Sequence, residues 1–450
     1  MQGENAASEW HVAKDQTLPA KAKVVVVGAG IVGCSVAFKL AKKNCQEVVV
    51  LERNALFITG GSSSHAPGGI LQLHPTSRTM TELARETAGV LTAARVFSQT
   101  GELFLASTPE RMEYFQWEAE HAARSGYTGV QVLTASEAKA LHPLIDESKV
   151  LGALHWPPNI GVGRAATVKA AETMALAAMS HPTAPVRFFA NTKVEAIETE
   201  GKKVVAVRTA WGQRIETEHV VVCAGAWGPT LTKTVGVDLP LVNVQHQWVL
   251  SQPLEALKEY QAPSNHDSLY QNSTTDLPCI FDSDHGVYVL QFGSCLGFGN
   301  YDHRAILVDA EQVEGHTHAE FPFTPRDFER AKANMEALLP CIKPLKAWKA
   351  FNGLMSFTPD GFPLVGPASN AVSGLWLGEG VWVMHSVGVG KMLAEWIVDG
   401  KPSLDMSQLD PRRFDSLQLS KEEIRRRIAT AYEGRCNVPP LPKSKVTARL

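Results

Sequence analysis

The sequence predicts an α/β protein with a Rossmann-like nucleotide-binding domain and a second, mixed α+β domain built on antiparallel strands. Four consecutive valines at residues 24–27 are typical of a strand that is buried on both faces. A G-x-G-x-x-G motif and a helical apolar pattern follow this strand directly. A second apolar run at residues 48–51 ends in Glu52, about 20 residues beyond the glycines, which is the spacing of a dinucleotide-binding fingerprint.

Each part of this fingerprint has a physical task. Gly28 allows a tight turn, Gly30 lets the backbone approach a pyrophosphate, and Gly33 lets the helix pack closely on the sheet. The free N–H groups and the dipole at the helix start favour the negative charge of a phosphate. Glu52 can accept hydrogen bonds from the ribose hydroxyls of an adenosine. The fingerprint predicts a bound dinucleotide but does not distinguish FAD from NAD.

Composition and charge narrow the possible partners. The net charge is −3, so no basic field favours a nucleic acid or an anionic membrane. The seven cysteines form no C-x-x-C pair, which argues against a zinc site or a redox dithiol and fits a reducing compartment. The first residues lack the apolar core of a signal peptide, and no apolar run approaches transmembrane length. We therefore expect a soluble enzyme without a metal.

The remaining elements follow from periodicity. Helical spacing predicts helices at 80–96, 110–125, 135–141, 164–179 and 387–398. Apolar or alternating runs predict strands at 101–107, 187–190, 192–198, 219–222, 244–250, 287–292 and 374–377. A charged helix at 421–434 is expected to be a solvated surface element.

The order of these strands predicts discontinuous domains. Strands near residues 24, 48, 193, 220 and 375 alternate with two inserted regions. The expected nucleotide-binding segments are 22–105, 161–235 and 349–415. The expected second domain, which would bind the substrate, comprises 106–160 and 236–348, and residues 416–450 form a C-terminal helix and tail.

Five stretches carry a family resemblance. They are GGSSSHAPGG at 60–69, CAGAW at 223–227, VQHQW at 244–248, FNGLMSFTPDGFPLVG at 351–366 and VWVMHSVGVGKMLAEWIVDG at 381–400. In this order they resemble the flavin-dependent amine oxidoreductases of the D-amino acid oxidase superfamily. Within it, the likeness is to the flavin half of dimethylglycine oxidase, followed by dimethylglycine and sarcosine dehydrogenases. The resemblance implies FAD as the cofactor and oxidation of a C–N bond.

The resemblance also implies roles for individual residues in holding FAD. Ile31, Val32, Glu52 and Arg53 would hold its AMP half beside the fingerprint glycines Gly28, Gly30 and Gly33, with Val194 beside the adenine half and Ala224, Gly225 and Trp227 near the diphosphate. Ser62, Ser63, Ser64, His65 and Gly69 match the loop that meets the flavin. In that subfamily this histidine is bonded covalently to the isoalloxazine ring, so His65 is expected to carry FAD; the alternative is a histidine that only hydrogen-bonds it. Val387, Gly388, Val389, Gly390 and Lys391 would open the last long helix against the flavin, although Lys391 fits a surface lysine equally well.

For the substrate, the resemblance selects His246 and Tyr301. His246 matches the histidine of an H-Q-Y motif near the substrate amine, and Tyr301 matches a tyrosine at the boundary between flavin and substrate. A histidine and a tyrosine can accept the ammonium proton and hold the amine. From the residues alone, a satisfied core histidine and a packed tyrosine would be favoured. Trp248 replaces the tyrosine of the motif, which leaves the substrate open.

The expected function is an FAD-dependent oxidase of a secondary or tertiary N-methyl amine that gives an iminium ion, an aldehyde and hydrogen peroxide. The folate-binding half of the resembling enzymes is missing from this chain, which favours a stand-alone oxidase with oxygen as acceptor. A dehydrogenase that delivers electrons to a carrier protein is one alternative. A flavin protein that tailors a larger secondary amine, or that has lost small-amine activity, is another. The final tripeptide Ala448-Arg449-Leu450 resembles a peroxisomal signal, and the expected location is otherwise cytoplasmic.

Overall fold

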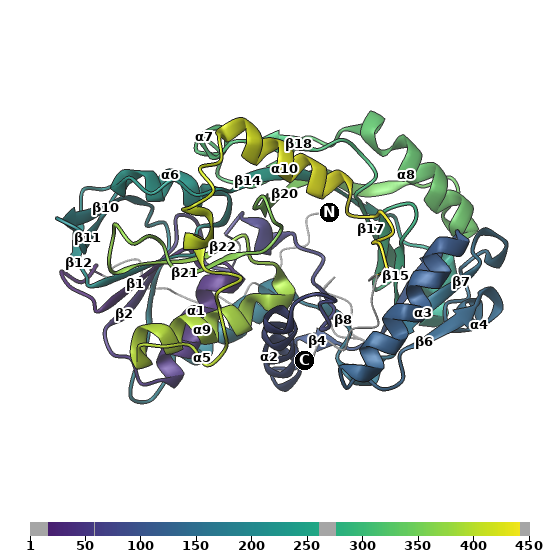
Figure 1. Ribbon diagram of the computed structural model, residues 1–450, viewed down its shortest axis with the longest axis horizontal. Helices are drawn as coiled ribbons and strands as arrows, with labels where there is room; N and C mark the ends of the chain where they lie inside the picture. Colours follow the sequence, from purple (N-terminus) through teal and green to yellow (C-terminus); the bar gives the residue numbers. More distant parts are fainter. Residues whose placement is uncertain (1–16, 58, 261–275, 442–450) are drawn as a thin grey trace, which may run out of the picture.

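Two runs of branched apolar residues lie side by side within a six-stranded sheet. The protein is represented by a computed structural model that describes residues 17–57, 59–260 and 276–441 (Figure 1). Val24 pairs with Val48 and Val27 with Leu51 in parallel register. The strand order is β21 (Leu364–Pro367), β22 (Leu375–Glu379), β13 (His219–Val222), β1 (Val24–Val27), β2 (Val48–Leu51) and β9 (Arg187–Phe189), and only β21 runs antiparallel to its neighbour.

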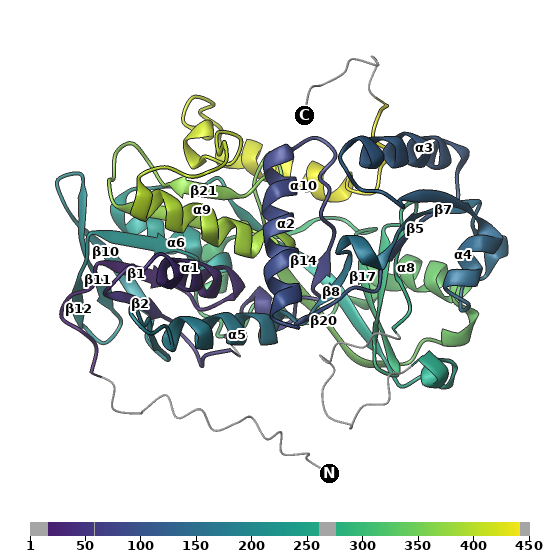
Figure 2. The same cartoon turned by 90° about the horizontal axis from the view of Figure 1, so that it is seen from below.

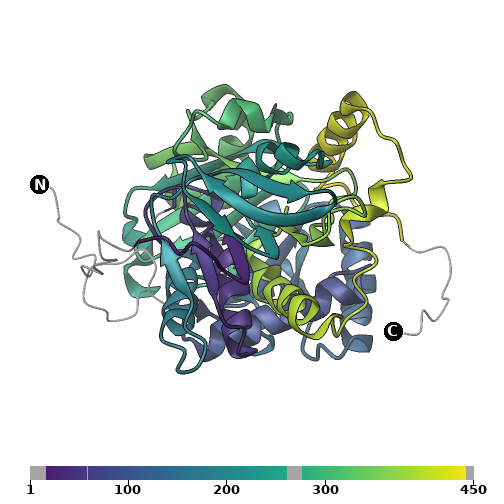
Figure 3. The ribbon, with the colours of Figure 1, turned by 90° about the vertical axis from the view of Figure 1, so that its left-hand side faces the viewer.

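The two faces of this sheet are covered by different layers, because successive side chains of a strand alternate in direction. Val24 and Val26 face a helical layer, and Val25 and Val27 face a small antiparallel sheet. The helices are α1 (Ile31–Lys42), α5 (Thr167–Met179) and α9 (Ser386–Asp399), which lie together in Figure 2. The small sheet is β10 (Val194–Glu200), β11 (Lys203–Thr209) and β12 (Arg214–Glu216), nearest the viewer in Figure 3. The four valines are therefore buried on both faces, as predicted.

A second, ten-stranded sheet forms the other side of the molecule. Its order is β19 (Glu320–Phe321), β20 (Ala347–Phe357), β14 (Val242–Ser251), β17 (Cys295–Asn300), β16 (Val287–Phe292), β15 (Cys279–Asp282), β5 (Glu102–Ala106), β7 (Gly152–Trp156) and β6 (Gln131–Thr134), with β18 (Ile306–Val308) paired to β14. All of its neighbours are antiparallel except β5 and β15. Leu103, Ile280 and Val289 pack on one face against α4 (Ala135–Leu141) and α8 (Pro325–Leu338). The opposite face is left for the site described below.

A second small sheet and five further α-helices complete the described part of the fold. This sheet joins β3 (Gly69–Ile70), β8 (Gly163–Ala165) and β4 (Phe97–Ser98). The other helices are α2 (Arg78–Ala93), α3 (Pro109–Arg124), α6 (Gly228–Thr232), α7 (Ala310–Val313) and α10 (Lys421–Glu433). Within the described ranges, no helix has the length and apolar content needed to cross a bilayer.

The predicted fold class is confirmed, and most predicted elements occur within a few residues of their expected bounds. The strand at 287–292 and the helix at 135–141 match completely. The helix predicted at 164–179 begins only at Thr167, because residues 163–165 pair as β8 with β3 and β4. β5 and β20, which the sequence analysis assigned mainly to nucleotide-binding segments, are hydrogen-bonded into the ten-stranded sheet.

The C-terminal helix α10 corrects one expectation. It occurs where predicted, but it is not a fully solvated element, because Ile428 and Tyr432 are completely buried. Ile424, Ile428 and Tyr432 follow one another at a spacing of four residues and form an apolar stripe on an otherwise charged helix. This stripe packs against Val244, Tyr301 and Phe357, and α10 lies across β14 at the top of Figure 1.

Candidate active site

A cavity of about 930 Å³ extends between the two sheets. One end is formed by the turns that follow β1, β2, β13 and β22, which is the edge where open α/β sheets bind ligands. The other end is formed by the free face of the ten-stranded sheet, including Phe104, Phe281, Tyr288 and Leu290. The cavity therefore joins the predicted nucleotide site to the predicted substrate residues.

The dinucleotide fingerprint forms the first end of the cavity. Gly28 has a φ of +101°, and a Cβ atom there would lie 2.4 Å from the carbonyl oxygen of Cys223, so only glycine fits this turn. The carboxylate of Glu52 accepts hydrogen bonds from the backbone N–H of Ala29 (2.8 Å) and of Asn54 (2.9 Å). Burial raises the pKa of Glu52, and these N–H groups oppose the shift. These hydrogen bonds fix Glu52 in the cavity wall, and its carboxylate can still accept further hydrogen bonds.

The serine-rich loop reaches the start of α1. Ser63 accepts a hydrogen bond from the N–H of Ile31 (3.0 Å), and Ser62 donates to the carbonyl oxygen of Leu354 (2.7 Å). Both line the cavity together with Gly30, Ile31, Val32 and Gly69. Ser64 instead accepts from the N–H of Gly60 (3.0 Å) and braces the loop from behind. Gly33 also lies outside the cavity wall, packed against the carbonyl of Gly28.

His65 lies where this loop passes β20. Its ring makes an edge contact with Phe351 and lies close to Gly353. Its Nδ1 atom is 3.5 Å from a carboxylate oxygen of Glu320, but neither ring nitrogen has a hydrogen-bond partner among the described residues. Burial lowers the pKa of His65 to about 4, although Glu320 opposes the shift. At neutral pH the imidazole is therefore uncharged.

The remaining predicted dinucleotide contacts meet in the same wall. Val194, Ala224, Gly225 and Trp227 all line the cavity. The guanidinium group of Arg53 stacks over the indole of Trp227 at 4.5 Å, and that indole donates to the carbonyl of Val313 (3.0 Å). The sequence prediction thus selected residues that the fold brings together from four separate segments.

The sequence prediction did not include one acidic residue of this wall, Glu379. Glu379 ends β22 and accepts hydrogen bonds from the N–H groups of Ala224 (2.6 Å) and Gly225 (3.1 Å). Burial raises its pKa well above the ordinary value, which favours the neutral acid. Its second oxygen has no hydrogen-bond partner among the described residues. An acid at the end of a buried apolar run is the signal that identified Glu52, and it could have identified Glu379 as well.

The flavin contacts predicted at the start of α9 lie outside the cavity wall. α9 begins at Ser386, and Val387, Gly388, Val389, Gly390 and Lys391 do not line the main cavity. Gly388 packs against the backbone of Leu83 and Gly390 against Ser35, so the small residues let α9 approach α2 and α1. Lys391 forms an ion pair with Glu395 (3.2 Å) at the surface. The cavity wall before this helix is made by residues 380–384 instead.

At the far end, His246 is held between two tyrosine hydroxyls. Its Nε2 atom is 2.9 Å from the hydroxyl of Tyr288, and its Nδ1 atom is 2.9 Å from the hydroxyl of Tyr432. The ring of Tyr301 lies 4.5 Å from the His246 ring, centroid to centroid. Burial, together with His303 and Arg435, lowers the pKa of His246 to about 3. The structure therefore brings the two predicted substrate residues together and adds Tyr288 and Tyr432, which the sequence analysis missed.

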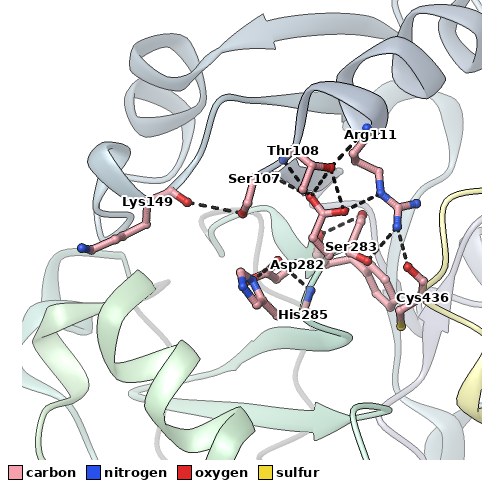
Figure 4. Close-up of polar contacts among 10 residues, drawn as sticks. Ser107, Thr108, Arg111, Lys149, Asp282, Ser283, His285 and Cys436 are labelled. Atoms are coloured by element: carbon pink, nitrogen blue, oxygen red, sulfur yellow. Dashed lines mark hydrogen bonds and ion pairs between the residues drawn. The ribbon is translucent and has the colours of Figure 1, made fainter.

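The segment after α10 closes this end of the cavity. The guanidinium group of Arg435 stacks over the rings of Trp382 (4.1 Å) and Tyr301 (5.2 Å). Buried Arg111 holds the segment in place, because it donates to the carbonyl oxygens of Cys436 and Ser283 (Figure 4). Arg111 also forms an ion pair with Asp284 (3.0 Å). Arg435 and Cys436 are thus part of the site.

Two carboxyl groups line the wall beyond these residues. Burial raises the pKa of Glu102 to about 8 and that of Glu118 to about 7, and the charge of Glu118 adds to the shift of Glu102. Both belong to the cavity lining. Each is therefore easily protonated near neutral pH. The sequence offered no motif that would have selected them.

The residues present fit FAD. Glu379 Oε2 and both ring nitrogens of His65 are buried polar atoms without described partners, and both residues belong to the cavity wall. Buried polar atoms in proteins are normally hydrogen-bonded, so a polar group in the cavity is expected beside them. Glu52 suits a ribose, and the start of α1 suits a diphosphate. His65 and residues 380–384 lie farther along, where the ring system of a flavin would extend.

Comparisons with known proteins agree with this geometry. A model of the family described as FAD-dependent oxidoreductases (DAO) matches residues 23–396. The chain is 28% identical to mouse mitochondrial dimethylglycine dehydrogenase, covering 88% of this chain and 44% of that protein. It is 28% identical to a 4-methylaminobutanoate oxidase (formaldehyde-forming) of Paenarthrobacter nicotinovorans, covering 94% and 49%. The chain thus spans about half the length of these two relatives.

Among solved structures, L-proline dehydrogenase from P. horikoshii superposes on this chain with a TM-score of 0.74 and is 26% identical to it in sequence. The match covers 90% of this chain and all of that one. Since the family model spans most of the sequence, this chain belongs to the family of FAD-dependent oxidoreductases.

Proposed function

We propose that this protein is an FAD-dependent oxidase of secondary or tertiary N-methyl amines of the dimethylglycine or sarcosine type. Two relatives support this substrate class through their names, dimethylglycine dehydrogenase and 4-methylaminobutanoate oxidase (formaldehyde-forming). The observation that carries the proposal is the contact of His246 Nε2 with the hydroxyl of Tyr288 (2.9 Å), beside the ring of Tyr301, in the cavity wall away from the dinucleotide fingerprint.

The chemistry explains why such a group is needed. An amine gives up a hydride from an adjacent carbon only when its nitrogen lone pair is free, so an ammonium substrate must first lose a proton. The substrate then loses the hydride and becomes an iminium ion, which water hydrolyses to an aldehyde and a shorter amine. When bound, FAD would supply the acceptor for this hydride and a route for the two electrons to oxygen, which would give hydrogen peroxide.

His246 and its neighbours provide the proton acceptor. A hydroxyl of Tyr288 that donates to His246 keeps its own lone pairs available to the cavity. It can therefore take the ammonium proton while it passes its own proton to the imidazole. Tyr301, whose ring contacts that of His246, bounds the space in which the amine would be held.

Arg435 is the proposed partner of the substrate carboxylate. Its guanidinium group stacks beside Tyr301 in the cavity wall. Among the described residues, no carboxylate lies within ion-pair distance of it, so its charge is available to an acidic substrate. This arrangement would place the carboxylate of an N-methylglycine on Arg435 and its amine near Tyr288.

We also propose that His65 carries FAD covalently. Nucleophilic attack requires a neutral imidazole, and the lowered pKa of His65 supplies one at neutral pH. Glu320, close to Nδ1, favours a proton on that nitrogen and hence a lone pair on Nε2. A histidine that only hydrogen-bonds the cofactor is the alternative, and the colour test described below separates the two.

A panel of amines tests the function. Sarcosine, dimethylglycine, 4-methylaminobutanoate and larger secondary amines are added anaerobically, and bleaching of the flavin is followed. The proposal expects bleaching by an N-methyl amino acid, and oxygen uptake matched by equal amounts of peroxide and aldehyde. Bleaching with turnover only when an artificial acceptor is added would indicate a dehydrogenase. Bleaching by larger amines alone would indicate a tailoring enzyme, and no bleaching by any amine would reject the proposal.

A peroxide producer suits a peroxisome, and we propose that location from Ala448-Arg449-Leu450, which lies outside the described residues. The expected result is that a fluorescent fusion at the N-terminus enters peroxisomes and becomes cytosolic when the three residues are removed.

A further inference from the structure

His246 is the second member of a chain of hydrogen bonds that leads out of the cavity. The hydroxyl of Tyr288 contacts His246 Nε2, and His246 Nδ1 contacts the hydroxyl of Tyr432, both at 2.9 Å. The hydroxyl of Tyr432 in turn lies 2.8 Å from Nε2 of His303. His303, which is only partly buried, ends the chain with its Nδ1 atom 2.7 Å from the carbonyl oxygen of Arg304.

The last contact determines the direction of all the others. A carbonyl oxygen only accepts, so His303 Nδ1 must carry a proton, and the neutral ring presents a lone pair at Nε2. Tyr432 therefore donates to His303 and accepts from His246 Nδ1–H. His246 in turn presents its lone pair at Nε2, where it accepts from Tyr288. The carbonyls of Asn300 (3.4 Å) and Gln245 (3.5 Å) also lie near the Tyr432 hydroxyl, but His303 is closer.

The surroundings favour a positive charge at the outer end of the chain. At the inner end, burial and the charges of His303 and Arg435 lower the pKa of His246. At the outer end, burial also lowers the pKa of His303, but the carbonyls of Arg304 and Asn300 and the carboxylates of Asp327 and Asp302 oppose that shift. A proton that enters at Tyr288 is therefore better accommodated at His303 than at His246.

We propose that the chain Tyr288–His246–Tyr432–His303 carries the proton of the substrate ammonium group from the cavity to the surface of the protein. The inference rests on the proposed amine oxidation. The ammonium group gives its proton to Tyr288, and each member passes one proton onward. The substrate becomes neutral, and His303 becomes an imidazolium ion that releases a proton to water. Tyr432 and His303 act as positioning residues, and α10 brings Tyr432 into place.

Tyr432→Phe interrupts the chain while it keeps the packing of the buried ring. Tyr127→Phe is the matched control, since Tyr127 is also buried and hydrogen-bonded, to Arg85 (2.8 Å), but lies outside the cavity. We expect anaerobic flavin reduction to slow about 100-fold in Tyr432→Phe, the lower end of the range for lost acid–base catalysis, with an unchanged substrate Kd. The control should reduce at the wild-type rate. A wild-type rate in Tyr432→Phe overturns the proposal.

A second variant covers the case in which Tyr432→Phe does not fold. His303→Ala, at a partly exposed position, should also slow reduction, and added imidazole should restore the rate by replacing the missing acceptor. A normal rate in His303→Ala, or a slow rate that imidazole leaves unchanged, overturns the proposal.

A spectroscopic measurement separates this inference from the proposed function. In the ¹⁵N-histidine NMR spectrum of the wild-type holoenzyme without substrate, His246 should carry its proton on Nδ1, and in Tyr432→Phe on Nε2. A wild-type proton on Nε2, or the same tautomer in both proteins, overturns the chain whatever the activity. If the tautomers behave as expected but no amine bleaches the flavin, the proposed function fails and the hydrogen-bond chain stands.

Discussion

A Cβ atom placed on Gly353 would lie 2.9 Å from Nε2 of His65 and 3.0 Å from its Cδ2. The imidazole of His65 thus rests directly on the backbone of β20. Gly353 also pairs with His246 across the strands, so the same stretch of β20 supports the predicted flavin-bearing histidine and neighbours the candidate catalytic one.

Gly353→Ala is expected to displace His65 and to reduce covalent flavin attachment strongly. The methyl group would occupy the space of the ring, and the ring is confined by Phe351 on another side. Acid precipitation measures the result, because covalent flavin leaves a yellow pellet. Gly89→Ala is the control, since its Cβ would meet nothing within 4 Å and alanine suits the interior of α2. Full attachment in Gly353→Ala would contradict a role for this contact.

His65→Ala should release the flavin colour into the acid supernatant. A pH series then tests the nucleophile in the wild-type apoprotein incubated with FAD. With a folded-state pKa of about 4, the imidazole keeps its free lone pair from pH 8 down to pH 5, so attachment should be nearly constant there and should fall as the pH passes through 4. A fall centred near 6.5 would show that the lowered pKa is wrong.

The nucleotide-binding half of the site was predictable because its signals are local. The valine runs, the glycine spacing and Glu52 all follow from about 30 consecutive residues, and the structure places Gly28, Gly30 and Glu52 in the cavity wall. The buried acid Glu379 follows a strand in the same way, but its segment was interpreted through the glycines farther on. Those glycines instead pack α9 against neighbouring helices.

The substrate half depends on pairing between distant strands. Tyr288 lies opposite Gly299 on β17, and Gly299 lies opposite Trp248 on β14, which brings Tyr288 near His246. No local sequence pattern reveals how these three strands pair. Tyr432 arrives from yet another segment, on a helix that was expected to be solvated; its position in the stripe with Ile424 and Ile428 could have indicated that the ring is buried.

His246→Ala is expected to slow anaerobic flavin reduction by about 100-fold or more, the range for a lost acid–base group. Tyr288→Phe should also slow flavin reduction, because it removes the hydroxyl through which the ammonium proton would reach His246. Stopped-flow absorbance at saturating substrate measures the limiting rate. An unchanged rate in His246→Ala would place the substrate elsewhere in the cavity.

Arg435→Met should weaken binding of substrates that carry a carboxylate by about 10- to 100-fold, since a hydrogen bond to a charged group contributes about 1.5–3 kcal/mol. Methionine keeps much of the apolar contact with Trp382. The Kd is obtained from the dependence of flavin reduction on substrate concentration. The exposed residue Arg326 provides the control variant Arg326→Met. Equal weakening for an N-methyl amine without a carboxylate would argue against this pairing.

His142 provides a test of the buried histidines through stability. It is 2% exposed, and burial lowers its pKa to about 4 from the ordinary 6.5. The folded state therefore holds the neutral ring, and the unfolded state binds a proton more readily. The neutral His142 ring therefore contributes fully to the free energy of unfolding above pH 6.5, and this contribution is lost as the pH falls toward 4. The loss amounts to about 3 kcal/mol of unfolding free energy over that interval. Urea unfolding of wild type and His142→Gln at several pH values measures it: the wild-type curve should fall more steeply between pH 6.5 and 4, and parallel curves would contradict the lowered pKa.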